Sequence, residues 1–247
     1  MRRRSEHVPP AVPAPRRLLA WATVYFLGFK KQKWAELILG AVAFILAMVV
    51  QNPIQQLPLI GIGIRSNADV IARGTVFTLG VALWLGGLVA GFVQEGVKYF
   101  LVKDKSPNTA LFVGLGFGIM EVLLIVITPI IAVAAAGGKL DVPALQALLS
   151  MVERYFAVLF HVGTTVYLAY AARNGFGKKG FLMMAILHGF VDTIAAYAQF
   201  LFLENKVLAM KFTIGLEVIF AVIAIALIAY TLPPARIEEP EEEKVIW

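Results

Sequence analysis

The sequence contains no cysteine and few charged residues. Without cysteine it can form no disulfide, no thiolate metal site and no cysteine nucleophile. Only 15% of its 247 residues are charged and 60% are hydrophobic, whereas a soluble domain is about 25% charged and about 45–50% apolar. The composition therefore excludes an ordinary soluble enzyme and a largely disordered chain. The apolar stretches are continuous rather than alternating, which also excludes an outer-membrane β-barrel.

Buried serine and aspartate are equally scarce. The serines are Ser5, Ser66, Ser106 and Ser150, and none lies deep in an apolar run. A serine-type intramembrane hydrolase is excluded, because it needs a buried serine beside a histidine. An aspartyl type needs two aspartates in the membrane, and only Asp192 lies in an apolar run. The H-E-x-x-H zinc motif is absent too, because Val-Gly-Thr-Thr follows His161.

Long apolar runs are what the sequence has in abundance. Six are long enough to cross about 30 Å of hydrocarbon at about 1.5 Å per residue. They cover residues 34–50, 74–102, 109–135, 151–172, 180–203 and 208–231. A seventh run, 18–29, is too short to span and predicts an N-terminal interfacial helix. The predicted fold is all-α, a polytopic transmembrane helix bundle of about six spans plus that interfacial helix, in contact with the lipid bilayer.

The remaining segments set the domain boundaries. The membrane domain is predicted to be 18–231, preceded by a disordered basic N-terminus at 1–17 and followed by an acidic tail at 232–247 that we also expect to be disordered. Prolines and glycines in 51–70 predict a loop or a broken helix there.

The formal net charge of +6 suggests nucleic-acid binding until the positions are examined. Most of the basic residues flank the spans, where membrane topology alone would place them, so no nucleic-acid partner is expected. With the N-terminus inside, fifteen lie on the inner side: Arg2, Arg3, Arg4, Arg16, Arg17, Lys30, Lys31, Lys33, Lys103, Lys105, Arg173, Lys178, Lys179, Arg236 and Lys244. Five lie on the outer side: Arg65, Arg73, Lys139, Lys206 and Lys211. This bias predicts an integral protein of the cell (inner) membrane with both termini cytoplasmic.

Ionisable residues within the spans are the candidates for function, because each costs about 2.5–3.5 kcal/mol to insert. Counted from the predicted inner ends of the helices, Glu95 and His188 lie about 12 Å deep, and Glu121, His161 and Asp192 about 18 Å deep. Four helices therefore contribute five ionisable groups to one layer. The sequence predicts a functional cluster in the inner half of the membrane.

The local spacings support this cluster. Glu95 and Lys98 are i and i+3 and can pair on one helix face. His188 and Asp192 are i and i+4, so the aspartate can orient the histidine ring.

Two further sets of charges are less informative. Glu153 and Arg154 are expected to form an interfacial ion pair near the outer surface, outside the layer. Glu217 either hydrogen-bonds within the bundle or belongs to the site. The glycines at 114, 116 and 118 are sufficiently explained by close helix approach.

A glutamate–histidine arrangement is the hydrolytic chemistry that remains. A carboxylate would act as general base on a water, and histidines would position that water or bind a metal that holds it. Two histidines and one glutamate are also an adequate set of ligands for catalytic zinc. The sequence leaves two possibilities open. Either the site uses no cofactor, or it binds zinc through His161, His188 and Glu121.

Four elements between about residues 90 and 200 resemble a known family, the intramembrane peptidases of the CAAX-protease and bacteriocin-processing (CPBP) group, and within it the YhfC-like branch. Residues 94–98 (QEGVK) resemble its E-E-x-x-R element, and 114–121 (GLGFGIME) its glycine-rich helix that ends in glutamate. Glu153-Arg154 followed by His161 is similar to its E-R element with a buried histidine, and 185–192 (AILHGFVD) to its final H-x-x-x-[ND] element.

This resemblance implies an intramembrane endopeptidase that acts on a membrane-associated peptide or protein. Glu95, Glu121, His161 and His188 would then be catalytic. Lys98, Asp192, Glu153 and Arg154 would support them.

Three positions depart from the family pattern. Gln94 stands where the group commonly has a base-like glutamate, Lys98 replaces arginine, and Phe117 occupies a place where relatives often have histidine. The base would then be Glu95 or Glu121. Lys98 is one turn from Glu95 and of opposite charge, which favours Glu121 as base, whereas the family pattern favours Glu95. The alternatives are a catalytically silent membrane scaffold or partner-binding subunit, and a proton-coupled transporter that uses the same charges as a relay.

Overall fold

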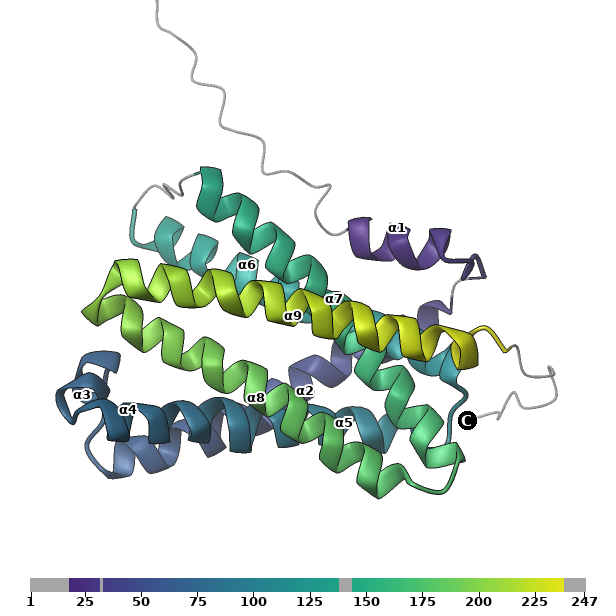
Figure 1. The fold of residues 1–247 in the computed structure, drawn as a ribbon, viewed down its shortest axis with the longest axis horizontal. Coiled ribbons are helices and arrows are strands. Elements are labelled where there is room, and N and C mark those ends of the chain that lie inside the picture. Colours follow the sequence, from purple (N-terminus) through teal and green to yellow (C-terminus); the bar gives the residue numbers. More distant parts are fainter. Residues whose placement is uncertain (1–17, 32, 138–143, 238–247) are drawn as a thin grey trace, which may run out of the picture.

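The computed structural model describes residues 18–31, 33–137 and 144–237. All regular elements of this part are helical (Figure 1): α1 (Leu18–Phe26), α2 (Trp34–Gly61), α3 (Asn67–Ala72), α4 (Thr75–Ala82), η2 (Leu83–Ala90), α5 (Gly91–Val102), α6 (Pro107–Ala135), α7 (Ala144–Arg173), α8 (Gly177–Glu204) and α9 (Lys206–Ala235). The element η2 is a π-helix that joins α4 to α5. The predicted all-α fold is confirmed.

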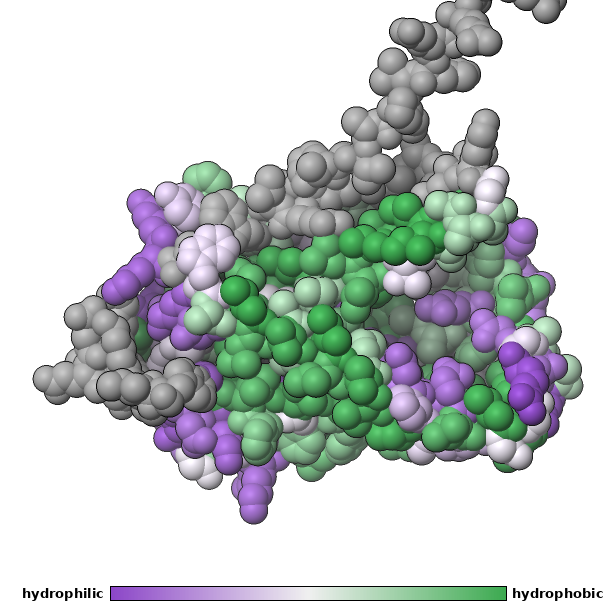
Figure 2. Space-filling view, turned by 180° about the vertical axis from the view of Figure 1, so that it is seen from behind, coloured by the Kyte–Doolittle hydropathy of each residue, from purple (hydrophilic) through white to green (hydrophobic). Residues whose placement is uncertain are grey.

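Six stretches are long and apolar enough to cross a membrane, with α4, η2 and α5 forming one of them, Thr75–Val102. Many large apolar side chains are exposed, among them Ile45, Ile186 and Val222. Figure 2 shows one face of the molecule, on which hydrophobic side chains fill the middle and hydrophilic side chains gather towards both ends. Because such a surface is stable against lipid, the chain is an integral membrane protein.

The predicted break in 51–70 is wrong for its first eleven residues, because α2 continues through Pro53 and Pro58 to Gly61. A membrane helix tolerates proline where neighbouring groups support the backbone. Here Gln55 donates from Nε2 to the carbonyl of Leu85 (2.7 Å), and Trp84 donates from Nε1 to the carbonyl of Gln55 (3.2 Å). These two bonds fasten the last turns of α2 to η2.

The C-terminal helix is also longer than predicted. α9 includes Pro233 and Pro234 and ends at Ala235, so the first four residues of the predicted tail are helical. The side-chain amide of Asn108 donates from Nδ2 to the backbone carbonyl of Ala235 (3.0 Å). The predictions for 1–17 and for the rest of the tail beyond Ile237 lie outside the described residues.

The first and last helices meet at one end of the bundle (Figure 1). Arg236, just after α9, donates from Nη2 to the carbonyl of Leu27, just after α1 (3.3 Å). The short connections 103–106, between α5 and α6, and 174–176, between α7 and α8, lie at this end, which we term the basic end. They fall within the turns that the sequence predicts at 103–108 and 174–180. Six spans lie between α1 and the end of α9, and an even number of crossings returns the chain to the side on which it began. The orientation in the membrane stays a prediction, as does the interfacial position of α1.

The central helix of the bundle is α7. Of the most apolar 18-residue stretch of its span, 78% is buried inside the protein, whereas the corresponding share in α9 is 17%. The alternating glycines of α6 permit close packing on two sides. A Cβ on Gly114 would come 2.7 Å from the carbonyl oxygen of His161 on α7, and one on Gly116 would come 1.8 Å from that of Leu37 on α2. Close helix approach is therefore the role of these glycines.

The second close contact joins η2 and the start of α5 to α8. A Cβ on Gly91 would come 2.4 Å from the carbonyl oxygen of Ala185, and one on Gly189 would come 2.3 Å from that of Gly87. Backbones that touch in this way fix the position of α5 relative to α8. The residues that follow on α5 are therefore held against the middle of α8.

Candidate functional site

Lys98 lies at the centre of the predicted cluster. Both Lys98 and Glu95 are fully buried on α5, and Nζ of Lys98 lies 2.5 Å from Oε1 of Glu95. The same Nζ donates to Oγ1 of Thr164 (2.7 Å) and lies 3.2 Å from Nδ1 of His161, both on α7. An ammonium has three N–H donors, and here each has an acceptor.

The two ring nitrogens of His161 have different partners. Because Lys98 can only donate, Nδ1 is the acceptor, which leaves the proton on Nε2. Nε2 then donates a short hydrogen bond to Oε2 of Glu121 on α6. The hydroxyl of Thr165 donates to the backbone carbonyl of His161 (2.6 Å). His161 thus connects Lys98 to Glu121.

His188 is held from the other side of the cluster. Its Nδ1 lies 2.6 Å from Oε1 of Glu95, which as a carboxylate accepts the hydrogen bond. Nε2 lies 3.5 Å from Oδ2 of Asp192, one turn further along α8, so a protonated ring would have a carboxylate oxygen at each nitrogen. The predicted pairings of Glu95 with Lys98 and of Asp192 with His188 are both present.

Aromatic rings surround the two imidazoles. The ring centroids of His161 and His188 are 5.3 Å apart. Phe117 packs on His161 (5.1 Å between centroids) and Phe160 on His188 (5.2 Å). Nζ of Lys98 also lies 5.3 Å from the centre of the Phe117 ring, a cation–π distance. Phe117, a departure from the family pattern, therefore packs directly against the cluster.

Arg154 and Glu153 are closer to this cluster than the sequence indicated. Arg154 pairs with Glu153, and its Nη1 lies 3.5 Å from Oε1 of Glu121. The expectation that this pair lies outside the layer is therefore wrong for Arg154. Its backbone is nearer the far end of α7, but a long arginine side chain carries its charge several ångströms from its own Cα.

A polar pocket borders the cluster, with about 60 Å³ accessible to water. Its walls come from α6, α7, α8 and α9: Glu121, Glu153, Arg154, Ala157, Phe160, His161, His188, Val191, Asp192, Ala195, Leu216, Glu217 and Phe220. A single water needs roughly 10–15 Å³ of such space. Along α7 the lining residues run from His161 back to Glu153, so the pocket extends away from the basic end.

Two further residues lie at the site: Glu217, for which the sequence left two roles open, and Thr164, which the sequence did not indicate. Glu217 lines the pocket from α9, and its buried Oε2 has no hydrogen-bond partner among the described residues. Its signal was a carboxylate in an apolar run. Thr164 gave no signal, because a threonine in a membrane helix commonly bonds its own backbone.

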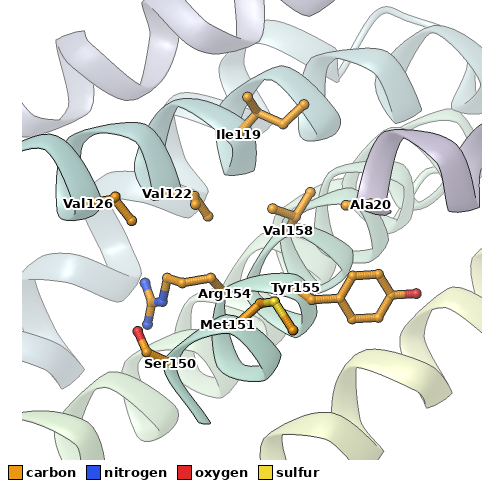
Figure 3. Close-up of a pocket in the computed structure, with 9 residues that line it drawn as sticks. All are labelled: Ala20, Ile119, Val122, Val126, Ser150, Met151, Arg154, Tyr155 and Val158. Atoms are coloured by element: carbon orange, nitrogen blue, oxygen red, sulfur yellow. The ribbon is translucent and has the colours of Figure 1, made fainter. Parts of the chain in front are cut away.

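An apolar pocket adjoins the polar one (Figure 3). It has about 50 Å³ accessible to water and lies between α1, α6 and α7, lined by Ala20, Ile119, Val122, Val126, Ser150, Met151, Arg154, Tyr155 and Val158. Arg154 belongs to both pockets. The side chain of Arg154 therefore borders both an apolar and a polar space.

Gln94 does not take part in the cluster. It is buried at the interface with α2, where Nε2 donates to Oε1 of Gln51 (3.1 Å). The carboxylate of α5 that meets a histidine is Glu95. Gln94 and Glu95 therefore lie on different faces of α5.

A sequence model of the YhfC intramembrane metalloprotease family matches residues 131–213 of the chain. The resemblance to that family is thereby confirmed over a segment that includes His161, His188 and Asp192. Glu95, Lys98 and Glu121 precede it. No curated protein and no solved structure matches the chain.

The family's description implies a metal ion, and the donors suit one in kind. One ligand atom each from Glu95, His161 and His188 lie within 4.8 Å of one another, so Glu95 rather than Glu121 is the carboxylate of this group. However, the ammonium of Lys98 contacts Glu95 and His161, and both ring nitrogens of His161 have partners. The residues as arranged do not fit a metal ion, and we derive no reaction step through one.

Proposed function

We propose that the chain is an intramembrane endopeptidase of the glutamate/histidine type. The observation that carries this proposal is the position of Glu121. Glu121 lines a pocket that has room for water and that both histidines also line, and His161 donates a hydrogen bond to its carboxylate. A carboxylate in such a place is suited to act as a general base.

The reaction balances with the residues at hand. Glu121 takes a proton from a water in the pocket, and the oxygen of that water bonds to the carbonyl carbon of the scissile peptide. The protonated Glu121 then gives its proton to the amide nitrogen as the C–N bond breaks. His188 also lines the pocket, where its ring can help to position the same water.

Arg154 is the candidate to stabilise the developing negative charge. Arg154 lines the pocket, and its guanidinium lies beside Glu121. A fixed cation near a carbonyl oxygen stabilises the tetrahedral intermediate. Glu95 and Lys98 do not line the pocket, so we assign them the role of holding the two histidines.

The substrate we propose is a membrane-associated peptide or protein. Arg154 lines both pockets, so a peptide bound along it could place an apolar side chain in the apolar pocket while its backbone reaches Glu121. The polar pocket extends away from the basic end. With both termini in the cytoplasm, the bond to be cleaved would approach from the outer half of the membrane.

The test is a cleavage assay with the full chain in proteoliposomes that contain membrane-peptide substrates. Glu121→Gln keeps the shape of the side chain but removes the base, so cleavage should fall at least about a hundredfold. The same loss is expected for His161→Ala and His188→Ala. Glu36→Gln, the same chemical change at the start of α2, should cleave like the parent.

Two outcomes would count against the proposal. If Glu121→Gln cleaves at the parent rate, Glu121 is not the base. If the parent cleaves none of the peptides but binds them, a silent partner-binding subunit is the better interpretation. That alternative is favoured by one observation, the complete burial and mutual pairing of Glu95 and Lys98.

A further inference from the structure

The ammonium of Lys98 lies among the side chains that would otherwise form a metal site. Its three acceptors are Oε1 of Glu95, Nδ1 of His161 and Oγ1 of Thr164, at 2.5, 3.2 and 2.7 Å. Two of these groups, Glu95 and His161, belong to the trio whose ligand atoms lie within 4.8 Å of one another. Lys98 therefore binds the donors from which a metal ion would be coordinated.

The fold holds the Lys98 side chain in place, whereas a lysine on the protein surface would be flexible. Its side chain is fully buried, and the Phe117 ring packs beside its charge. Hydrogen bonds satisfy all three of its donors, so moving the ammonium away would leave a buried charge without partners. A dication placed beside it would also meet a like charge at contact distance.

We propose that Lys98 serves as the resident cation of this site in place of a divalent metal ion. The ammonium then does two of the things that a metal does for such residues. It balances the carboxylate of Glu95, and it occupies Nδ1 of His161 so that Nε2 carries the proton directed at Glu121. The wild-type chain accordingly holds no metal ion at Glu95, His161 and His188.

The experiment measures metal content and needs no enzymatic activity, so its result is independent of the proposed peptidase function. The full chain is purified in detergent, incubated with zinc, desalted and analysed for zinc per chain. Wild type should retain well under about 0.1 zinc per chain. Lys98→Met removes the charge with little change in volume and should retain about one zinc, because two histidines and a carboxylate are then free to bind it.

Two controls identify the cause. Lys98→Arg keeps the positive charge and should retain no more zinc than wild type. The double variant Lys98→Met/His188→Ala should lose the zinc that Lys98→Met gains. Zinc should also raise the thermal midpoint of Lys98→Met and leave that of wild type unchanged, because a ligand stabilises only the folded state that binds it.

Either of two results overturns the proposal. One is about one zinc per wild-type chain that is lost in His161→Ala or His188→Ala. The other is a folded Lys98→Met that retains no zinc. If Lys98→Met does not fold, Lys98→Ala replaces it. If neither neutral variant folds, wild type and Lys98→Arg decide: absence of zinc in both supports the proposal, and bound zinc in either refutes it.

Discussion

Oε1 of Glu95 lies 2.6 Å from Nδ1 of His188, although 93 positions separate the two residues in the sequence. The same oxygen is 2.5 Å from Nζ of Lys98, so one atom joins α5, α8 and, through Lys98, α7. The other oxygen of Glu95 is buried without a hydrogen-bond partner among the described residues. The stability of the bundle should therefore depend on this one carboxylate.

Glu95→Gln should destabilise the protein by about 3–5 kcal/mol, because it leaves the buried Lys98 without its counter-charge. The measurement is unfolding in detergent, followed by circular dichroism. Adding Lys98→Met to Glu95→Gln should recover most of the loss. Asp104→Asn removes an exposed partner of Lys103 and should cost no more than about 1 kcal/mol. Equal stability of Glu95→Gln and Asp104→Asn would contradict the role given to Glu95.

Gly189→Ala should disrupt the packing of α8 on η2. The new Cβ would lie 2.3 Å from the carbonyl oxygen of Gly87, and a backbone atom cannot move aside as a side chain can. We expect a loss of about 1–3 kcal/mol or more, measured by the same unfolding. Gly215→Ala on α9, where nothing lies within 4 Å, is the matched control and should be at least as stable as the parent.

The topology prediction follows from the distribution of basic residues. Reporter fusions after residues 105 and 176 should report the cytoplasm, and a fusion after 140 should report the outer side. The structure places the first two at the basic end, where α1 and the end of α9 also meet. A reversed pattern would move the polar pocket to the inner half of the membrane.

Val126→Trp should fill the apolar pocket of Figure 3 without touching the polar one. If a substrate side chain binds there, KM should rise about tenfold or more while kcat changes little, because a contact equal in ground state and transition state is lost. Ile131→Trp, on the exposed face of the same helix, is the control and should behave like the parent. An unchanged KM in Val126→Trp would exclude this pocket from substrate binding.

Much of this structure could be predicted because it follows from regular geometry. A membrane helix needs a long apolar run, so the six spans were evident. A constant rise of about 1.5 Å per residue placed Glu95, Glu121, His161 and His188 at similar depths, and in the structure they are neighbours. Depth, however, says nothing of which way a side chain points around its helix.

The pairings could not be predicted for that reason. Which carboxylate meets which histidine depends on helix rotation, and on α5 the rotation is set by η2, which no sequence pattern indicated. The break expected at Pro53 and Pro58 is absent from that part of α2, because hydrogen bonds between Gln55 and η2 support the helix there. Arg154 lies closer to the cluster than its place in the sequence indicates, because its guanidinium is several ångströms from its Cα.

The π-helix η2 lets the chain vary in length without disturbing the site. In an α-helix each residue turns the chain by about 100°, and a π-helix accommodates an extra residue within nearly the same rise. Deleting one residue of η2 would restore regular helix and leave Glu95 and Lys98 facing the histidines, whereas deleting Phe92 from the α-helical start of α5 would swing them roughly a quarter-turn away. A homologue could therefore be one residue shorter between Ala82 and Gly91 and still keep the cluster.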